Sequence, residues 1–161
     1  MFMNDKKACF SAKTDEWSTP DDFYNVLNSI YQFTLDPCAS DDSHKCEKYY
    51  TIETNGLLQS WENDVVWMNP PYSKSKEWIE KAYNEYLEGS TVICLTASRT
   101  DTKMFHSFCT KASALCFIKG RLKFGGSKHP APFPSLLTVF DRNLNEDKIE
   151  ALSSLGFCVM L

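Results

Sequence analysis

A short apolar run that ends at two prolines constrains the fold of this chain more than any other feature. The run is Val65-Val66-Trp67-Met68, and Asn69-Pro70-Pro71-Tyr72 follows it directly. Four successive apolar residues, most of them β-branched or aromatic, are typical of a buried strand. Because proline has no N–H to donate to a neighbouring strand, the strand must end where the prolines begin. The sequence therefore predicts a rigid turn at the carboxyl end of a buried strand.

Strand-like and helix-like patterns alternate along most of the chain. Apolar residues at helical spacing, flanked by capping residues or glycine, predict helices over residues 20–30, 75–88, 101–112 and 145–155. Short apolar runs predict strands over residues 33–35, 49–51, 65–68, 91–95, 115–118, 136–140 and 157–161. This alternation predicts an α/β fold with helices on both faces of a mainly parallel sheet. We expect one domain over residues 1–161, with residues 1–13 flexible.

The first predicted helix has the clearest boundary signals. Thr19 suits the N-cap, and Pro20 suits the first helical position. Helical spacing then turns one set of apolar side chains toward the core: Phe23, Val26, Leu27 and Ile30.

Three polar segments each follow a predicted strand. They are residues 36–38, 69–72 and 99–101. In open α/β sheets, ligands bind beyond the carboxyl ends of the strands. We therefore expect all three segments to lie on one rim of the sheet and to form the functional site there.

Bulk composition excludes several classes of protein. No apolar run is long enough to span a bilayer, and residues 1–13 lack the pattern of a signal peptide. We expect a cytoplasmic protein without a membrane partner. The seven cysteines form no C-x-x-C pair, which argues against a disulfide framework. The cluster Cys38, His44 and Cys46 lacks the tight pairing of zinc ligands, so we expect no metal.

Charge is unevenly distributed along the chain. The net charge is −4, yet residues 1–64 carry −7 and residues 99–129 carry +6. The basic segment fits either a patch for nucleic-acid phosphates or a solvated surface. Arg121 and Lys123 alternate with Leu122 and Phe124, so both charges should lie on one face of a strand or hairpin. That face fits phosphate contact and, equally, an edge strand protected by charge.

The tetrapeptide at residues 69–72 offers the groups needed to methylate an amine conjugated to a ring. Such an amine, like N6 of adenine, is a poor nucleophile because its lone pair is delocalised. Two acceptors against its N–H groups would localise that pair: the Asn69 side-chain oxygen and the Pro70 carbonyl, in a turn stiffened by Pro71. Tyr72 offers a face on which a base can stack. Positioning and electrostatics would then do most of the catalysis.

Six blocks of the sequence, taken in order, resemble the phage-type DNA N-6-adenine methyltransferases, compact relatives of the Dam enzymes. The blocks are Glu16-Trp17-Ser18-Thr19-Pro20, residues 35–40, residues 67–72, residues 99–102 with Phe105-His106, residues 120–124 and residues 131–135. The resemblance implies a class I methyltransferase fold, which is Rossmann-like, and S-adenosylmethionine as the methyl donor. It also implies DNA as the partner, with the target adenine flipped out or single-stranded.

The resemblance also implies roles for particular residues. The residues expected to bind the cofactor are Trp17, Thr19, Pro20, Asp36, Pro37, Cys38, Ala39 and Glu53. The usual Gly-x-Gly after the first strand is missing, so residues 37–39 would have to allow the cofactor's close approach. Glu53 fits the ribose hydroxyls and fits a surface position as well. Positive charge, rather than the resemblance, marks the residues expected to contact DNA: Lys74, Arg99, Arg121, Lys123 and Lys128. His106 fits either the rim or a structural position.

Other readings of the tetrapeptide stay open. Asn-Pro-Pro-Tyr also occurs in methyltransferases that act on RNA guanine or on protein glutamine amides, and N4-cytosine enzymes carry a similar motif. The surrounding blocks favour DNA adenine. A catalytically silent phage protein that binds nucleic acid is the alternative from a different class. Residues 51–64 and 120–134 have room for DNA-recognition loops, and the sequence specifies no oligomeric state.

Overall fold

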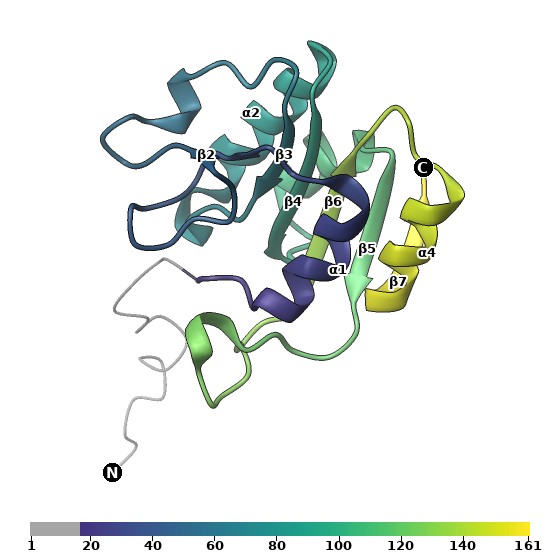
Figure 1. Ribbon diagram of the computed structural model, residues 1–161. Coiled ribbons are helices and arrows are strands. Elements are labelled where there is room, and N and C mark those ends of the chain that lie inside the picture. The colour runs from purple at the N-terminus through teal and green to yellow at the C-terminus, as the bar shows by residue number, and fades with distance from the viewer. Residues whose placement is uncertain (1–16) are drawn as a thin grey trace.

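The computed structural model describes residues 17–161 (Figure 1). The expectation that residues 1–13 are flexible concerns a part of the chain outside this range. Within it, seven strands form one sheet in the order β2-β1-β3-β4-β6-β5-β7. Their bounds are β1 Leu35–Asp36, β2 Lys48–Tyr49, β3 Val65–Met68, β4 Thr91–Ala97, β5 Ala114–Ile118, β6 Ser135–Phe140 and β7 Gly156–Met160. The α-helices are α1 Asp21–Tyr31, α2 Ser75–Leu87, α3 Lys103–Ser107 and α4 Glu146–Leu155.

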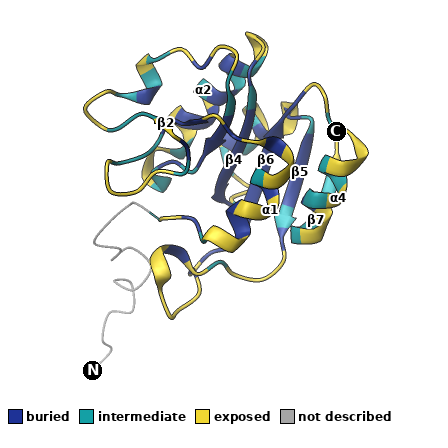
Figure 2. Ribbon diagram, in the orientation of Figure 1, coloured by how far each residue is buried: buried dark blue, intermediate teal, exposed yellow. Residues whose placement is uncertain are grey.

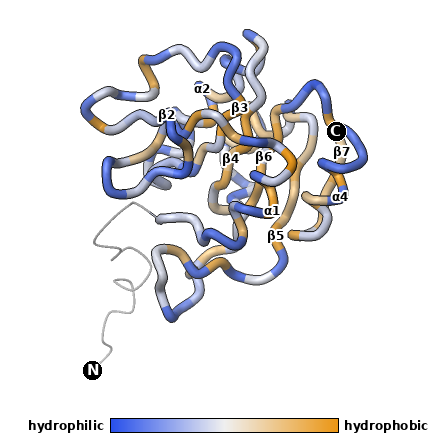
Figure 3. The backbone as a smooth tube through the Cα atoms, in the orientation of Figure 1, coloured by the Kyte–Doolittle hydropathy of each residue, from blue (hydrophilic) through white to orange (hydrophobic). Residues whose placement is uncertain are grey.

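Helices cover both faces of the sheet, as predicted. Successive residues of a strand point to opposite faces, so Trp67 packs with α1 and α4 while Val66 and Met68 pack with α2 and α3. The central strands β4 and β6 are almost wholly buried (Figure 2). Hydrophobic residues concentrate there, and hydrophilic ones lie mainly on the connecting segments (Figure 3). Strands buried on both faces explain why their sequences read as continuous apolar runs.

The prediction of a mainly parallel sheet is right for one half only. Strands β2, β1, β3 and β4 pair in parallel, but the pairings β4–β6, β5–β6 and β5–β7 are antiparallel. The reason lies in the connections. Parallel neighbours need a crossover, usually a helix. Residues 119–134 join β5 to β6 with only a short 3-10 turn, Phe124–Gly126, so β6 returns beside β5 in the opposite direction.

The predicted start of the first helix is wrong by one residue. The helix begins at Asp21, and Pro20 occupies the N-cap without a side-chain cap. The Thr19 hydroxyl accepts a hydrogen bond from Nδ2 of Asn69 instead, at 3.0 Å. Thr19, which was predicted to cap the helix, therefore contacts Asn69 at the rim of the sheet.

The predicted core face of this helix is only half right. Phe23 and Leu27 are buried, but Val26 and Ile30 are exposed by 36% and 39%. Two tyrosines complete the buried face: Tyr24 and Tyr31, both packed on Phe33. Because tyrosine combines an apolar ring with a polar tip, helical spacing alone did not assign it to the core.

Most other elements lie within about two residues of their predicted bounds. Asn145 caps α4 as predicted, since its side chain accepts from the N–H of Lys148. The helix predicted over residues 101–112 is instead two pieces, α3 and a 3-10 turn at Cys109–Lys111, with Phe108 in a non-helical conformation between them. Residues 121–124 form no strand, although Arg121 and Lys123 are exposed while Phe124 is buried. No helix within residues 17–161 is long and apolar enough to cross a membrane.

Gly56 lies in a close contact that shapes the rim of the sheet. A Cβ atom at this position would come within 2.2 Å of the Pro37 carbonyl oxygen. The Gly56 carbonyl in turn accepts a hydrogen bond from Nε1 of the buried Trp61, at 3.0 Å. Only glycine lets the segment after β2 approach the end of β1 this closely.

We predict that Gly56→Ala destabilises the fold by about 2 kcal/mol or more, because the clash involves backbone that cannot move aside. Urea unfolding measures the change. Leu58→Ala in the same 3-10 turn is the matched control: Leu58 is 79% exposed, so its free energy of unfolding should change by less than about 0.5 kcal/mol. Equal stability of Gly56→Ala and the wild type would contradict the contact.

Candidate active site

The candidate site lies where the chain order of the sheet reverses. From β1 the chain passes to β2 on one side, and then to β3 on the other side. In α/β sheets, ligands bind in the crevice beyond the carboxyl ends of the strands at such a point. Here the two strand ends carry Asp36 and Asn69. A cavity of about 820 Å³ opens at this position, a size within the usual range for small-molecule sites.

The cavity gathers segments from distant parts of the chain. Its lining consists of Trp17, Ser18, Thr19, Asp36, Pro37, Cys38, Ala39, Ser40, Ser43, His44, Lys45, Thr51, Ile52, Asn55, Gly56, Leu57, Trp67, Asn69, Pro71, Lys74, Glu77 and Trp78. The structure thus brings together most of the residues predicted for the cofactor and the catalytic turn. Pro20, Pro70 and Tyr72 do not line it, and Glu53 lines a smaller neighbouring depression of about 210 Å³.

The side chain of Asn69 has a defined orientation. Its Nδ2 donates hydrogen bonds to the Trp17 carbonyl and to the Thr19 hydroxyl. Its Oδ1 is buried and has no hydrogen-bond partner among the described residues. Leaving a buried acceptor without a donor costs about 1–3 kcal/mol, and such atoms are rare in folded proteins. Asn69 therefore presents an unused acceptor at the site.

Tyr72 lies in a cluster of aromatic side chains. Its ring meets Phe124 and Phe133 edge-on, with centroids 6.2 and 5.0 Å apart. Trp17 meets the same two rings edge-on, at 5.7 and 5.5 Å. Burial raises the pKa of the Tyr72 hydroxyl far above its ordinary value, so the phenol stays protonated. Tyr72 can serve as an aromatic surface but not as a base.

Asp36 binds the loop that follows it. Its Oδ1 accepts from the N–H of Cys38 at 3.3 Å, and its Oδ2 accepts from the N–H of Lys45 at 3.0 Å. Burial raises the pKa of this carboxyl to about 6, against the opposing effect of the two backbone hydrogen bonds. Asp36 lines the cavity, where a ligand contact was expected, and its two oxygens also hold the two ends of one loop, residues 38–45. We call this segment the cofactor loop, a name for its expected role.

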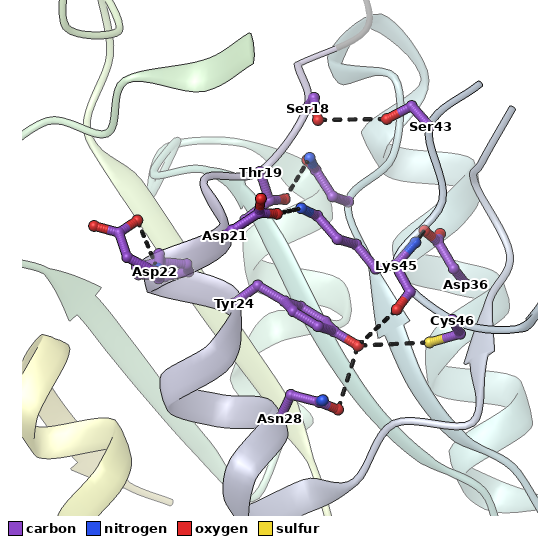
Figure 4. Close-up of polar contacts among 12 residues, drawn as sticks. Ser18, Thr19, Asp21, Asp22, Tyr24, Asn28, Asp36, Ser43, Lys45 and Cys46 are labelled. Carbon is purple, nitrogen blue, oxygen red and sulfur yellow. Dashed lines mark hydrogen bonds and ion pairs between the residues drawn. The ribbon is translucent and has the colours of Figure 1, made fainter. Parts of the chain in front are cut away.

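Helix α1 supports the cofactor loop from the side (Figure 4). Lys45 forms an ion pair with Asp21 at the start of this helix. The Tyr24 hydroxyl donates to the Lys45 carbonyl at 3.1 Å and lies 3.7 Å from Sγ of Cys46. The loop is thus fixed by α1 and by Asp36 together.

Sequence reasoning missed one wall of the cavity. Asn55, Gly56 and Leu57 form it with Trp78 of α2. Asn-Gly is a turn signal, so the Asn55-Gly56 pair could have marked a sharp bend after the second strand. Trp78 gave no such signal, because its helical spacing predicted only a core position.

The basic segment of the chain does not form a single patch. Lys111 precedes β5 at the sheet edge opposite the cavity, with its Nζ over the rings of Tyr83 and Phe108. Lys123 and Lys128 are exposed on the loop of residues 119–134, at the same edge as the cavity.

Three other polar residues that were predicted near the site lie outside the cavity lining. Arg121 lies on the same loop and is exposed, and its Nη1 donates to the Ala131 carbonyl at 3.2 Å. Arg99 follows β4 at the expected rim but does not line the cavity. His106 is exposed on α3 and does not line it either.

Comparison with known proteins identifies the family. The model of the DNA N-6-adenine-methyltransferase (Dam) family matches residues 6–153. A DNA N-6-adenine-methyltransferase of Escherichia phage T1 is 33% identical over 113 residues, which cover 69% of this chain. A protein of the same name from Haemophilus phage HP1 is 30% identical over 136 residues, or 79% of this chain. The matched regions span 48% of the phage T1 protein and 79% of the phage HP1 protein. Because the family model extends over most of the sequence, this chain belongs to the DNA N-6-adenine-methyltransferase (Dam) family.

Proposed function

We propose that this protein transfers a methyl group from S-adenosylmethionine to the N6 amine of adenine in DNA. The observation that carries the proposal is the buried Oδ1 of Asn69, an acceptor without a partner beside a cavity of suitable size. An N–H of the target amine would satisfy this oxygen and offset its desolvation cost. The names of the two phage relatives support adenine in DNA as the substrate.

Asn69 and Pro70 would activate the amine together. The Asn69 side-chain oxygen and the Pro70 carbonyl each accept one N–H, which draws the nitrogen lone pair out of conjugation with the ring. The two prolines restrict the backbone of the turn, which would fix the Pro70 carbonyl before the substrate arrives. The hydrogen bonds from Nδ2 of Asn69 to Trp17 and Thr19 hold the amide that carries the other acceptor. Tyr72, backed by Phe124 and Phe133, would stack on the base. Since Oδ1 is sealed from solvent, neighbouring side chains must move aside to admit a flipped base.

The cavity fits S-adenosylmethionine in size and in chemistry. When bound, this cofactor supplies a methyl group already activated on a sulfonium. The cofactor loop, fixed by Asp36, would hold one end of it, and Leu57 and Trp78 on the facing wall offer apolar surface for its purine. Gly56 keeps this wall close to the loop. Trp17, Thr19 and Pro20 would close the side nearest Asn69, and Glu53 at the rim would take a peripheral part.

A Rossmann-like class I methyltransferase fold agrees with this arrangement. The reversal of chain order lies beside β1, the strand before the cofactor loop, and the catalytic turn follows the neighbouring β3. Loop 119–134, with Arg121, Lys123 and Lys128, would track DNA phosphates at the same rim, together with Lys74 and Arg99.

Asn69→Ala tests the proposal most directly. We expect methyl transfer to fall about a hundredfold or more, because an acceptor used in the transition state is lost. Cofactor affinity should stay close to that of the wild type. Tritium transfer from labelled cofactor to DNA measures the rate, and nucleoside analysis of the product identifies the methylated base.

Matched variants make the Asn69 experiment specific. Asn25→Ala, at an exposed position of α1, should leave the rate unchanged. Tyr72→Ala should weaken capture of the base by roughly 1–3 kcal/mol, while Tyr72→Phe should be mild. Label found in cytosine would show that cytosine, and not adenine, is the substrate. A near wild-type rate in Asn69→Ala would show that the tetrapeptide is only a structural turn.

Asp36→Asn should weaken binding of S-adenosylmethionine about tenfold or more. The amide would present an NH2 group to a backbone N–H of Cys38 or Lys45, so one end of the cofactor loop would come loose. Calorimetry measures the affinity. Asp41→Asn in the same loop is the control, because Asp41 is exposed and its Oδ1 accepts a hydrogen bond from the Tyr49 hydroxyl rather than from the backbone of the loop. An unchanged affinity in Asp36→Asn would remove Asp36 from the support of the cofactor.

The raised pKa of Asp36 gives the same variant a pH signature. Burial raises this pKa from about 3.8 to about 6, so the folded protein binds the proton more tightly than the unfolded chain does. Folding stability of the wild type relative to Asp36→Asn should therefore fall by at most roughly 3 kcal/mol between about pH 4 and pH 6, and stay constant above that range. A stability difference that rose with pH would contradict the burial of this carboxylate.

Salt dependence tests the DNA surface. Lys123→Ala and Lys128→Ala should each reduce the log–log slope of DNA affinity against salt by about one, if each lysine neutralises one phosphate. Lys111→Ala removes the same charge from the opposite sheet edge and should leave the slope unchanged. Equal slopes for all three variants and the wild type would show that the loop only solubilises the surface.

A further inference from the structure

The Thr19 hydroxyl contacts Asn69 directly. It accepts a hydrogen bond from Nδ2 of Asn69 at 3.0 Å, and the threonine is only 4% exposed. The same Nδ2 donates to the carbonyl of Trp17. Asn69 therefore uses both amide hydrogens on one short segment, residues 17–19, that is 50 residues or more away in sequence.

These two contacts decide which way the amide of Asn69 faces. An asparagine amide carries two donors on nitrogen and an acceptor on oxygen, and its terminal torsion is broad and roughly two-fold. The Trp17 carbonyl can only accept, so a flipped amide would set two oxygens against each other. One such contact selects the correct face but leaves rotation about the last bond loosely defined. The Thr19 hydroxyl supplies the second point and fixes the direction of Oδ1.

The segment that carries these acceptors is itself anchored on two sides. The Ser18 carbonyl accepts from the N–H of Gly125 at 2.8 Å, and its hydroxyl lies 3.4 Å from that of Ser43 in the cofactor loop (Figure 4). The Trp17 ring packs edge-on against Phe124 and Phe133. A segment held this way can act as a fixed reference for a side chain.

We propose that Thr19 is a positioning residue, which orients the Asn69 amide so that Oδ1 faces the target amine. The inference rests on the proposed function, because it assigns the Asn69 oxygen to that amine. It differs from a role in which Thr19 only contacts the cofactor. A cofactor contact would change cofactor affinity, whereas a positioning contact changes the rate at saturating cofactor.

Two substitutions at Thr19 and one elsewhere test the inference. Thr19→Val keeps the shape and removes the hydroxyl, Thr19→Ser keeps the hydroxyl, and Thr110→Val removes an exposed hydroxyl on another surface. We expect Thr19→Val to lower the single-turnover methylation rate by about 10- to 100-fold with cofactor affinity within about twofold. Thr19→Ser should restore most of the rate, and Thr110→Val should match the wild type. In an Asn69→Ala background, Thr19→Val should have no further effect on the rate.

A measurement independent of activity separates this inference from the proposed function. In ¹⁵N-labelled protein, loss of a side-chain amide signal in Asn69→Ala assigns the Asn69 NH2 group. Both of its protons should exchange slowly with solvent in the wild type, and one should exchange faster in Thr19→Val but not in Thr19→Ser. If the protein methylates no DNA yet shows this pattern, the proposed function fails and the orientation by Thr19 stands.

Three results would overturn the positioning role. The first is an unchanged amide signal in Thr19→Val. The second is a Thr19→Val variant that loses cofactor affinity but keeps its saturating rate, which would make Thr19 a cofactor contact. The third is equal damage from Ser and Val, which would reduce Thr19 to a packing position.

Discussion

The parallel pairing of β1 with β3 decides where every part of the site lies. The two strands meet through Leu35 and Val66, and both end at the same edge of the sheet. Asp36 is the last residue of β1 and Asn69 directly follows β3, so residues 33 positions apart in sequence flank one crevice. The pairing is brief, since β1 spans only Leu35–Asp36. Both residues before the turns are fully buried, Leu35 at 0% exposure and Met68 at 0%, which anchors the strand ends where backbone pairing is short.

The site keeps polar atoms that the fold itself does not use. Oδ1 of Asn69 and the hydroxyl of Tyr72 are buried without a partner among residues 17–161. Each such atom costs stability, and a chain selected for stability alone would replace it or pair it. Departures of this kind concentrate at functional sites, where a ligand later supplies the missing partner. The two atoms belong to the same four-residue turn, and Nε1 of Trp78 in the cavity lining is a third. Four other side chains within residues 17–161 also carry a buried polar atom without a partner: Tyr31, Thr96, Ser135 and Thr138.

Sequence patterns located the elements and the rim of the sheet, because those depend on local periodicity and on prolines. Residues 65–68 were predicted as a strand and residues 75–88 as a helix, and both are found almost unchanged. The partners of polar side chains were not predictable in the same way. Threonine is a residue type that favours helix N-caps, yet the Thr19 hydroxyl accepts a hydrogen bond from Asn69. A contact between residues 50 positions apart leaves no signal in the local sequence around either of them.

The hydrogen-bond partners of Asp36 were not predictable from the sequence either. An acid at the end of a strand suggested a ligand contact, and nothing in the sequence indicated that its two oxygens accept from backbone N–H groups two and nine residues later. These hydrogen bonds depend on the path of the cofactor loop. That path could not be predicted, because the sequence of the loop has no periodicity. The sequence left the basic segment open between a phosphate patch and a solvated surface. The crossover from β4 to β5 carries Lys111 to the far edge of the sheet, so the segment forms no single patch.

A rigid turn alone is insufficient to place an amide oxygen. The prolines of the Asn-Pro-Pro-Tyr turn restrict its backbone, but they leave the side-chain torsions of Asn69 free. The acceptors that orient the amide come from a different segment, and residues 17–19 supply both. The aromatic rings that anchor this segment, Phe124 and Phe133, also pack against Tyr72. One apolar cluster thus supports the proposed stacking surface and the orientation of the amide together. Its two phenylalanines lie on loop 119–134, the loop that also carries Lys123 and Lys128 toward the proposed DNA surface.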